Sequence, residues 1–136
     1  MGFSNAVSRN GGLRRDATVS LIGVIDDDES VRDALGSLLR SAGYKCEVFP
    51  SAEAFLESGR IAATECVVLD IQMPGLNGFE LHLKLRQMRC SLPVIFVTGQ
   101  GDEELRARAL KNGATALLRK PFSDEALLGA IQSVVG

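Results

Sequence analysis

The sequence predicts an α/β fold in which a five-stranded parallel sheet is covered by helices on both faces. Short apolar runs alternate with longer amphipathic segments, five of each, between residue 19 and residue 135. The apolar runs are hydrophobic at nearly every position, as in strands that are buried on both sides. Helices between consecutive strands are the crossovers that a parallel sheet requires, and their right-handed sense distributes them over the two faces.

The first strand and the first helix are predicted before residue 44. Residues 19–25 form the first apolar run. Residues 30–42 follow as a helix, because apolar residues recur there at intervals of three and four. Ser30 and Asp33 have the spacing of a capping box, and Gly43 stands where such a helix should end.

A second strand, a short helix and a central strand come next. Residues 44–49 are more polar than the first run, which suits a strand at the edge of the sheet. Ser51 is a capping residue in front of a short helix that contains Phe55. Residues 66–69 form a strongly apolar run, and Asp70 follows it directly.

The third helix is predicted over residues 76–88. Leu81, Leu85 and Met88 share one face at helical spacing and are expected to point into the core. His82 is expected to be a half-exposed surface histidine and not a phosphorelay histidine.

The last two strands and helices complete the alternation. Residues 93–97 form a strand that leads to Thr98, and residues 102–111 form a helix. Residues 115–118 form a short strand, after which Ser123 caps the final helix.

Composition and charge restrict the class of protein. The chain has 136 residues and a net charge of -2. Basic residues are scattered among acids, which argues against nucleic-acid binding by this domain itself.

Residues 1–17 lack an apolar segment and are expected to be a flexible leader before a single domain at 18–136. No run approaches the length of a membrane span, so we expect a soluble cytoplasmic protein without membrane contact. The three cysteines lack metal-ligand spacing and are expected to be buried or half-buried free thiols: Cys46, Cys66 and Cys90.

Polar groups gather at the ends of four predicted strands. Ligands in such sheets bind outside the carboxyl ends of the strands, so these groups should meet at one edge. The groups are Asp26, Asp27, Asp28, Asp70, Thr98 and Lys120. Adjacent carboxylates repel one another and require a cation, and oxygen donors favour Mg²⁺ over zinc. A carboxylate at Asp70 could then attack a phosphoryl group, with Lys120 neutralising its oxygens.

Four short segments resemble the signatures of response-regulator receiver domains, in the order and spacing of that family. They are residues 24–28 (VIDDD), 69–75 (LDIQMPG), 97–99 (VTG) and 120–122 (KPF). The resemblance extends over about residues 19 to 135 and includes receivers of LuxR-type transcription regulators. It implies a flavodoxin-like (βα)5 fold with strand order 2-1-3-4-5.

The resemblance also implies a metal site and a phosphorylation site. Asp70 corresponds to the residue that accepts the phosphoryl group. Asp27, Asp70 and the backbone carbonyl of Gln72 correspond to the direct Mg²⁺ ligands. Asp26 corresponds to the acid that acts through metal-bound water.

Further positions correspond to the switching elements of the family. Thr98 matches the switch hydroxyl, and Lys120 matches the lysine that pairs with the phosphate. Asp28 is expected at the start of the first helix rather than on the metal. A cis peptide is implied between Lys120 and Pro121. Leu117 departs from the family, which often has a switching aromatic residue there, so the coupling of Thr98 to the surface is left open.

The implied function is a phosphorylation-dependent signalling switch in a two-component system. A sensor histidine kinase or an acyl phosphate would supply the phosphoryl group. The output surface would lie near residues 102–135, a face that could also form a homodimer on phosphorylation. Transcription would be controlled through an effector outside this chain. The domain would catalyse only its own phosphorylation and dephosphorylation and would not be a turnover enzyme.

Other functions fit less well or stay open. A phosphatase of the haloacid-dehalogenase type requires an acid two residues after the nucleophile, where this chain has Gln72. A flavin or nucleotide module would need a phosphate-cradling loop in place of the acidic residues 26–28. A stand-alone receiver and a receiver-like module that signals without phosphorylation are the two open alternatives.

Overall fold

Five parallel strands form one sheet with the order β2-β1-β3-β4-β5 in the computed structural model. The strands are β1 (Leu21–Ile25), β2 (Lys45–Phe49), β3 (Cys66–Asp70), β4 (Val94–Thr98) and β5 (Ala116–Arg119). The helices are α1 (Glu29–Ser41), α2 (Ala52–Glu57), α3 (Gly78–Gln87), α4 (Glu103–Lys111) and α5 (Asp124–Val135). The predicted fold class and strand order are therefore confirmed.

The structure describes residues 20–73, 75, 77–88, 91–99, 103–111 and 113–135, without the side chains of residues 105 and 106. The predicted leader at residues 1–17 and the third cysteine, Cys90, lie outside this part. None of the described helices has the length and hydropathy that crossing a bilayer requires.

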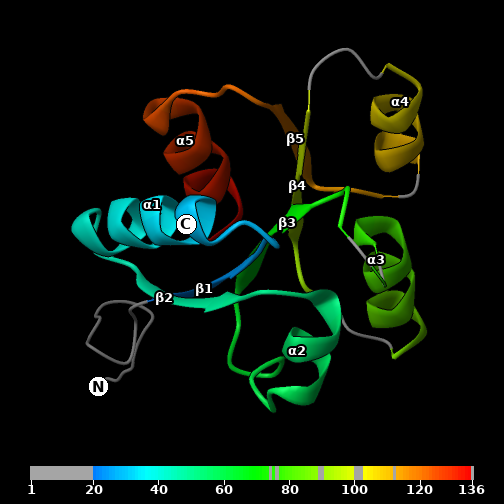
Figure 1. Cartoon of the computed structure of the whole chain (residues 1–136), viewed down its shortest axis with the longest axis horizontal. Coiled ribbons are helices and arrows are strands. Elements are labelled where there is room, and N and C mark those ends of the chain that lie inside the picture. Colours follow the sequence, from blue (N-terminus) through cyan, green and yellow to red (C-terminus); the bar gives the residue numbers. More distant parts are fainter. Residues whose placement is uncertain are drawn as a thin grey trace, which may run out of the picture.

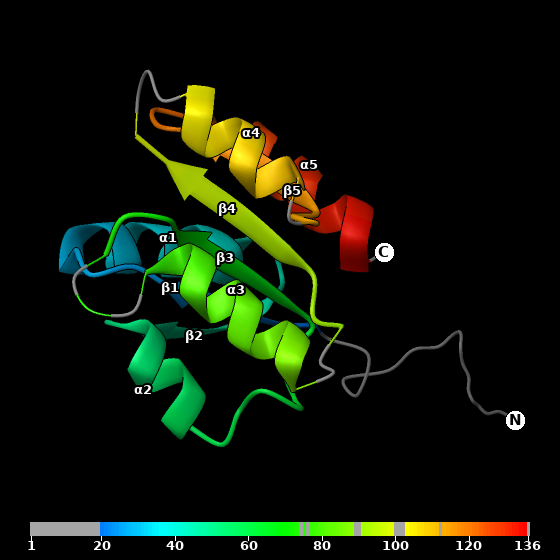
Figure 2. The same ribbon diagram turned by 90° about the vertical axis from the view of Figure 1, so that its right-hand side faces the viewer.

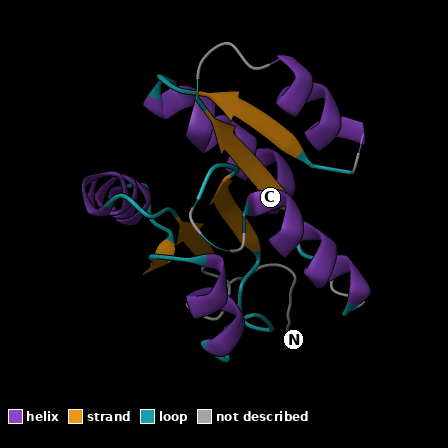
Figure 3. Cartoon of the chain, turned by 45° about the vertical axis from the view of Figure 1, so that its right-hand side comes forward, coloured by secondary structure: helices purple, strands orange, loops and turns teal. Residues whose placement is uncertain are grey.

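The helices cover the sheet in two layers. Helices α1 and α5 lie on one face, and α2, α3 and α4 lie on the other (Figure 1). Figure 2 shows the second group in front of the sheet, and Figure 3 shows the strands between both groups. Two hydrophobic clusters correspond to the two layers: Leu39 and Ile131 belong to the first, and Phe55 and Leu81 to the second.

The central strands contribute to both clusters because successive side chains of a strand point to opposite faces. In β3, Val68 packs toward α1 and α5, whereas Val67 and Leu69 pack toward α2, α3 and α4. All five residues of β3 are buried. This confirms the prediction that the strand is hydrophobic at nearly every position because it is buried on both sides.

Helix α1 begins differently from the prediction. It starts at Glu29, and the carboxylate of Asp28 accepts hydrogen bonds from the backbone N–H groups of Ser30 and Val31, at 2.8 and 3.3 Å. The predicted capping box at Ser30 and Asp33 is wrong, because Asp28 already satisfies the free N–H groups of the first turn. The expectation that Asp28 starts the helix is confirmed.

Helix α3 is shorter than predicted. It begins at Gly78, where Asn77 and Glu80 form a capping box that the sequence reading missed. It ends at Gln87, and Met88 is the C-terminal cap with 56% of its surface exposed. The inward orientation predicted for Met88 is wrong, because the helical repeat stops before this residue.

His82 is buried, which corrects the expectation of a half-exposed surface histidine. Only 8% of its surface is exposed, and its ring meets the Phe96 ring edge-on with centroids 5.5 Å apart. Gly78, His82 and Leu85 are spaced by four and three residues and therefore share the face of α3 that packs on the sheet. This spacing is the signal in the sequence from which the burial of His82 could have been predicted.

The two described cysteines are free, as expected. Cys66 is buried and Cys46 is half-buried. Burial raises the pKa of the Cys66 thiol to about 12. This thiol is therefore neutral at physiological pH and serves as a small apolar core residue.

Gly78 allows α3 to begin directly against the end of β3. A Cβ atom at this position would lie 2.8 Å from the carbonyl oxygen of Asp70 and 2.9 Å from the Cα atom of Ile71. The Gly78 N–H donates a hydrogen bond to the Ile71 carbonyl at 3.0 Å. The first turn of α3 is therefore attached to the strand end that carries Asp70.

We expect Gly78→Ala to destabilise the protein by about 2 kcal/mol, because the backbone atoms that a methyl group would meet cannot rotate away. Urea denaturation followed by circular dichroism measures this change. Gly129→Ala in α5 is the matched control, since no atom lies within 4 Å of a Cβ atom there. The control should gain up to about 1 kcal/mol from helix propensity. Equal effects of the two substitutions would contradict the close contact.

Candidate functional site

The carboxyl ends of β1, β3, β4 and β5 carry the predicted polar groups at one edge of the sheet. Asp26 follows β1, Asp70 ends β3, Thr98 ends β4, and Lys120 follows β5. These four strands are consecutive neighbours in the sheet. Strand order reverses between β1 and β3, so the edge at Asp26 and Asp70 is where α/β sheets bind ligands.

Three carboxylates form a cluster at this edge. Asp26, Asp27 and Asp70 each offer a carboxylate oxygen, and these oxygens all lie within 4.8 Å of one another. Asp26 and Asp70 are buried, with 3% and 8% of their surfaces exposed, whereas Asp27 is exposed. Two negative charges at this separation repel by about 3 kcal/mol at an effective dielectric constant of about 20. The donor set consists of hard oxygens and suits a divalent cation such as Mg²⁺.

Backbone N–H groups fix the two buried carboxylates. The Asp26 carboxylate accepts a hydrogen bond from the N–H of Asp28 at 2.9 Å. The Asp70 carboxylate accepts one from the N–H of Gln72 at 3.0 Å. Each acid is thus held by the residue two positions later, in the turn that leaves its own strand.

Lys120 lies between the two buried acids. Its Nζ atom is 3.5 Å from Oδ2 of Asp26 and 3.7 Å from Oδ2 of Asp70. The lysine side chain is about one-third exposed, so its charge is accessible from solvent. The peptide bond between Lys120 and Pro121 is cis, which confirms the expectation from the resemblance.

Burial raises the pKa of the Asp70 carboxyl above its ordinary value. Lys120 and the hydrogen bond from Gln72 oppose this shift, and the charges of Asp26 and Asp27 reinforce it. Ionisation of the Asp70 carboxyl therefore costs more free energy in the folded protein than in water. A cation next to the carboxylate would lower this cost.

Thr98 carries a buried hydroxyl at this edge that has no hydrogen-bond partner among the described residues. The residue is 1% exposed. Buried hydroxyl groups normally form a hydrogen bond. An unpaired hydroxyl at the edge of the sheet where ligands bind therefore indicates that a bound group accepts its hydrogen bond.

Leu117 occupies the position where the family often has an aromatic residue. It pairs with Phe96 of β4 and is partly buried against the cluster under α2, α3 and α4. An aliphatic side chain cannot form a hydrogen bond. Leu117 therefore contributes only apolar packing at the position where many receivers have a switching aromatic residue.

Arg32 is a residue of the site that the sequence reading missed. Its Nη1 atom donates a hydrogen bond to the backbone carbonyl of Asp26 at 2.8 Å. Arg32 is half-buried in α1 and therefore ties this helix to the acidic loop. A basic residue within two turns of an acidic strand end was the available signal.

Comparison with known proteins identifies the family. The response regulator receiver domain family matches residues 22–132. The chain belongs to this family. It is therefore a receiver domain of two-component response regulators, a family that generally binds Mg²⁺ at an acidic pocket and accepts phosphoryl groups from histidine kinases.

Two curated relatives illustrate the match. The receiver is 40% identical over 116 residues to the response regulator protein TodT of Pseudomonas putida, covering 85% of this chain and 51% of TodT. It is 42% identical over 112 residues to the transcriptional regulatory protein FixJ of Bradyrhizobium diazoefficiens, covering 82% of this chain and 55% of FixJ. The chain thus spans about half the length of the curated relatives it matches.

A solved structure agrees with the fold. The response regulator StyR superposes with a TM-score of 0.79 at 44% identity, over 86% of this chain and 59% of StyR. The receiver of this chain therefore shares both its sequence signatures and its architecture with response regulators.

We expect Asp70→Asn to raise the melting temperature at pH 7 without divalent cations by about 4 °C, or about 1 kcal/mol. The folded-state pKa of Asp70 lies above that of the unfolded chain, so ionisation lowers stability as pH rises through the folded pKa. The difference between variant and wild type should shrink as pH falls toward the ordinary carboxyl pKa of 3.8, because protonation of Asp70 then removes the buried charge. Thermal unfolding at several pH values measures both effects.

Asp33→Asn is the matched control for charge, because Asp33 is exposed in α1. It should leave the melting temperature within about 1 °C of wild type. A lower melting temperature for Asp70→Asn at pH 7 would contradict the unfavourable burial of this carboxylate.

Proposed function

We propose that Asp70 accepts a phosphoryl group from a sensor histidine kinase or from a small acyl phosphate. The observation that carries this proposal is a buried carboxylate that is held by a backbone N–H and lies 3.7 Å from Lys120. A fixed carboxylate is an effective nucleophile, and an ammonium group beside it stabilises the charge of an incoming phosphoryl group.

The residues present fit Mg²⁺. Asp27, Asp70 and the backbone carbonyl of Gln72 would hold it, with Asp26 acting through water. The clustered oxygens of Asp26, Asp27 and Asp70 support this assignment, and so does the raised pKa of Asp70, which a cation would offset. When bound, Mg²⁺ supplies positive charge that neutralises phosphoryl oxygens.

The chemical step is an in-line displacement at phosphorus. A carboxylate oxygen of Asp70 forms the new P–O bond, and the bond to the imidazole nitrogen or acyl oxygen of the donor breaks. The electron pair leaves with the donor group. The Lys120 side chain pairs with the transferred phosphoryl group. Water later hydrolyses the acyl phosphate and regenerates the carboxylate.

Thr98 is the proposed sensor of this modification. Its unpartnered Oγ1 would donate a hydrogen bond to the phosphoryl group on Asp70, which requires movement at the end of β4. Thr98 pairs with Arg119 in β5, and Arg119 forms an ion pair with Glu103 of α4. This connection offers a path to the surface of residues 102–135 that does not need an aromatic residue at position 117.

The proposed output is a change in that surface, including homodimer formation. Control of transcription would pass to an effector in the intact protein, in line with the relative FixJ, which is a transcriptional regulatory protein. The receiver itself would not bind nucleic acid and would catalyse only its own phosphorylation and dephosphorylation. A cytoplasmic location, which fits a receiver domain, is also proposed.

We expect the protein to gain the mass of one phosphoryl group when it is incubated with Mg²⁺ and acetyl phosphate. Intact-mass spectrometry detects the adduct. The adduct should be absent from Asp70→Asn and from samples with a chelator. Asp33→Asn should retain it, because this exposed carboxylate lies outside the cluster.

Beryllium fluoride distinguishes a short-lived phosphate from none at all, because it mimics the acyl phosphate and is not hydrolysed. Binding without a mass adduct would indicate rapid hydrolysis. Failure of both reactions would refute phosphorylation at Asp70 and favour a receiver-like module that signals by binding alone.

We expect Thr98→Val to leave the mass adduct intact while abolishing the response of residues 102–135 to beryllium fluoride. Amide spectra measure this response. The variant should also gain about 1 kcal/mol of stability, because it removes a buried hydroxyl without a partner. Thr64→Val is the matched control and should lose about 1 kcal/mol, since the Thr64 hydroxyl donates to the Arg60 carbonyl at 2.7 Å. A full spectral response in Thr98→Val would contradict the sensor role.

A further inference from the structure

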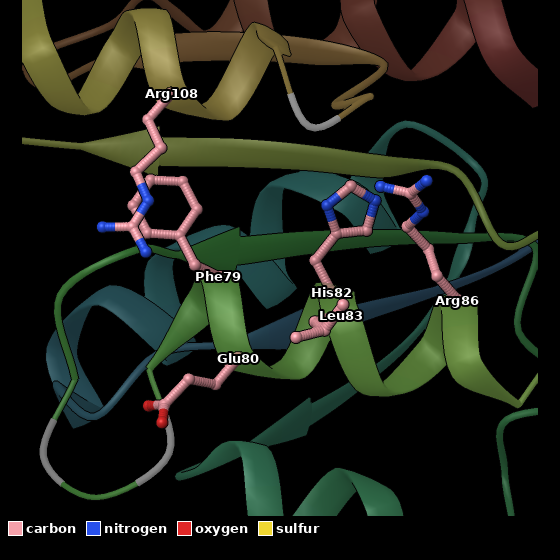
Figure 4. Close-up of a pocket in the computed structure, with 6 residues that line it drawn as sticks. All are labelled: Phe79, Glu80, His82, Leu83, Arg86 and Arg108. Carbon is pink, nitrogen blue, oxygen red and sulfur yellow. The ribbon is translucent and has the colours of Figure 1, made fainter.

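A small cavity lies on the side of α3 that faces α4, separate from the carboxylate cluster. Its volume is about 200 Å³. Six side chains line it, five from α3 and one from α4: Phe79, Glu80, His82, Leu83, Arg86 and Arg108 (Figure 4). The phosphorylation mechanism uses none of these residues.

The charged groups that face this cavity are mainly basic. Arg86 and Arg108 contribute guanidinium groups from two different helices. The carboxylate of Glu80 points away, toward the loop before α3 (Figure 4), where it accepts a hydrogen bond from the N–H of Asn77 at 2.9 Å. The cavity therefore presents two guanidinium groups, whose N–H donors suit an anionic group of a ligand.

His82 lies in the wall of the cavity, and 92% of the residue's surface is covered. Its one described ring contact is with Phe96 of β4. An imidazole N–H in this wall can donate a hydrogen bond to a ligand that accepts one.

The remaining walls are apolar. The Phe79 ring lies under the Arg108 guanidinium, which is 4.6 Å from the ring centroid. Leu83 borders the cavity and is more than half exposed. A ligand with a hydrocarbon part fits these walls better than inorganic phosphate does, and the volume is too small for a nucleotide.

We propose that this cavity binds a small organic carboxylate. The carboxylate group would accept hydrogen bonds from His82 and Arg86, whose side chains lie next to each other in Figure 4. The hydrocarbon part would contact Phe79 and Leu83. The site is new relative to the phosphorylation site and does not depend on it.

The protonation of His82 provides a second signature of this binding. Burial, and then the charge of Arg86, lower the pKa of His82. Glu80 and Arg108 are the other charged residues that line the cavity, and β4 contributes the uncharged Phe96 to the histidine. A bound carboxylate would raise this pKa, so binding should strengthen as pH falls.

Nuclear magnetic resonance of the imidazole tests the proposal directly. His82 is the single histidine of the chain, so its side-chain signals need no further assignment. Butyrate is the probe, and butyramide is its neutral counterpart of the same shape. We expect butyrate to shift the His82 signals with saturation, at a dissociation constant on the order of 1 mM. Butyramide should not shift them.

Two substitutions separate the site from general charge effects. Arg86→Gln should weaken butyrate binding about tenfold, because it removes a charge-assisted hydrogen bond. Lys84→Gln removes the same charge from an exposed position of α3 that does not line the cavity, and it should leave binding unchanged.

Three results would overturn the proposal. The first is an absence of saturable shifts of His82 with butyrate. The second is an equal loss of affinity in Arg86→Gln and Lys84→Gln. The third is equal binding of inorganic phosphate, which would show that the apolar walls contribute nothing.

Discussion

Repulsion between carboxylates at the end of β1 and β3 is the constraint on which the rest of the structure depends. Asp26 and Asp70 are buried next to each other because their strands are neighbours at the point where strand order reverses. Folding places these charges together at a cost, and Lys120 and two backbone N–H groups offset part of it. The part of this cost that is not offset is the basis of the proposed response of the edge to a cation and to a phosphoryl group.

Packing on both faces of the sheet holds the acids of this edge in place. Both faces of the sheet are covered by helices, and the central strands have no exposed residues. Gly78 brings α3 against the Asp70 carbonyl, and Arg32 ties α1 to the Asp26 carbonyl. Two helices therefore position the two acids from opposite faces of the sheet.

Phe96 connects the phosphorylation edge with the cavity beside α3. Its ring contacts Phe79 and His82, which line that cavity, and it lies two residues before Thr98 in β4. A ligand in the cavity would thus contact side chains that pack on the strand that ends in Thr98, the proposed sensor of phosphorylation. This arrangement gives the receiver a physical basis for responding to two different chemical signals.

The sequence by itself determined the fold class and the identity of the residues at the functional edge. Alternating periodicities specify strands and helices, and the acids, Thr98 and Lys120 stand at strand ends whatever the details of packing. Tertiary structure decided what depends on contacts between distant segments. The burial of His82 depends on Phe96 of another strand, and the hydrogen bond of Arg32 depends on the path of the loop after β1. The local sequence also does not decide at which residue α1 starts, because Asp28 and Ser30 are both good capping residues. Only the path of the chain from β1 into the helix selected Asp28.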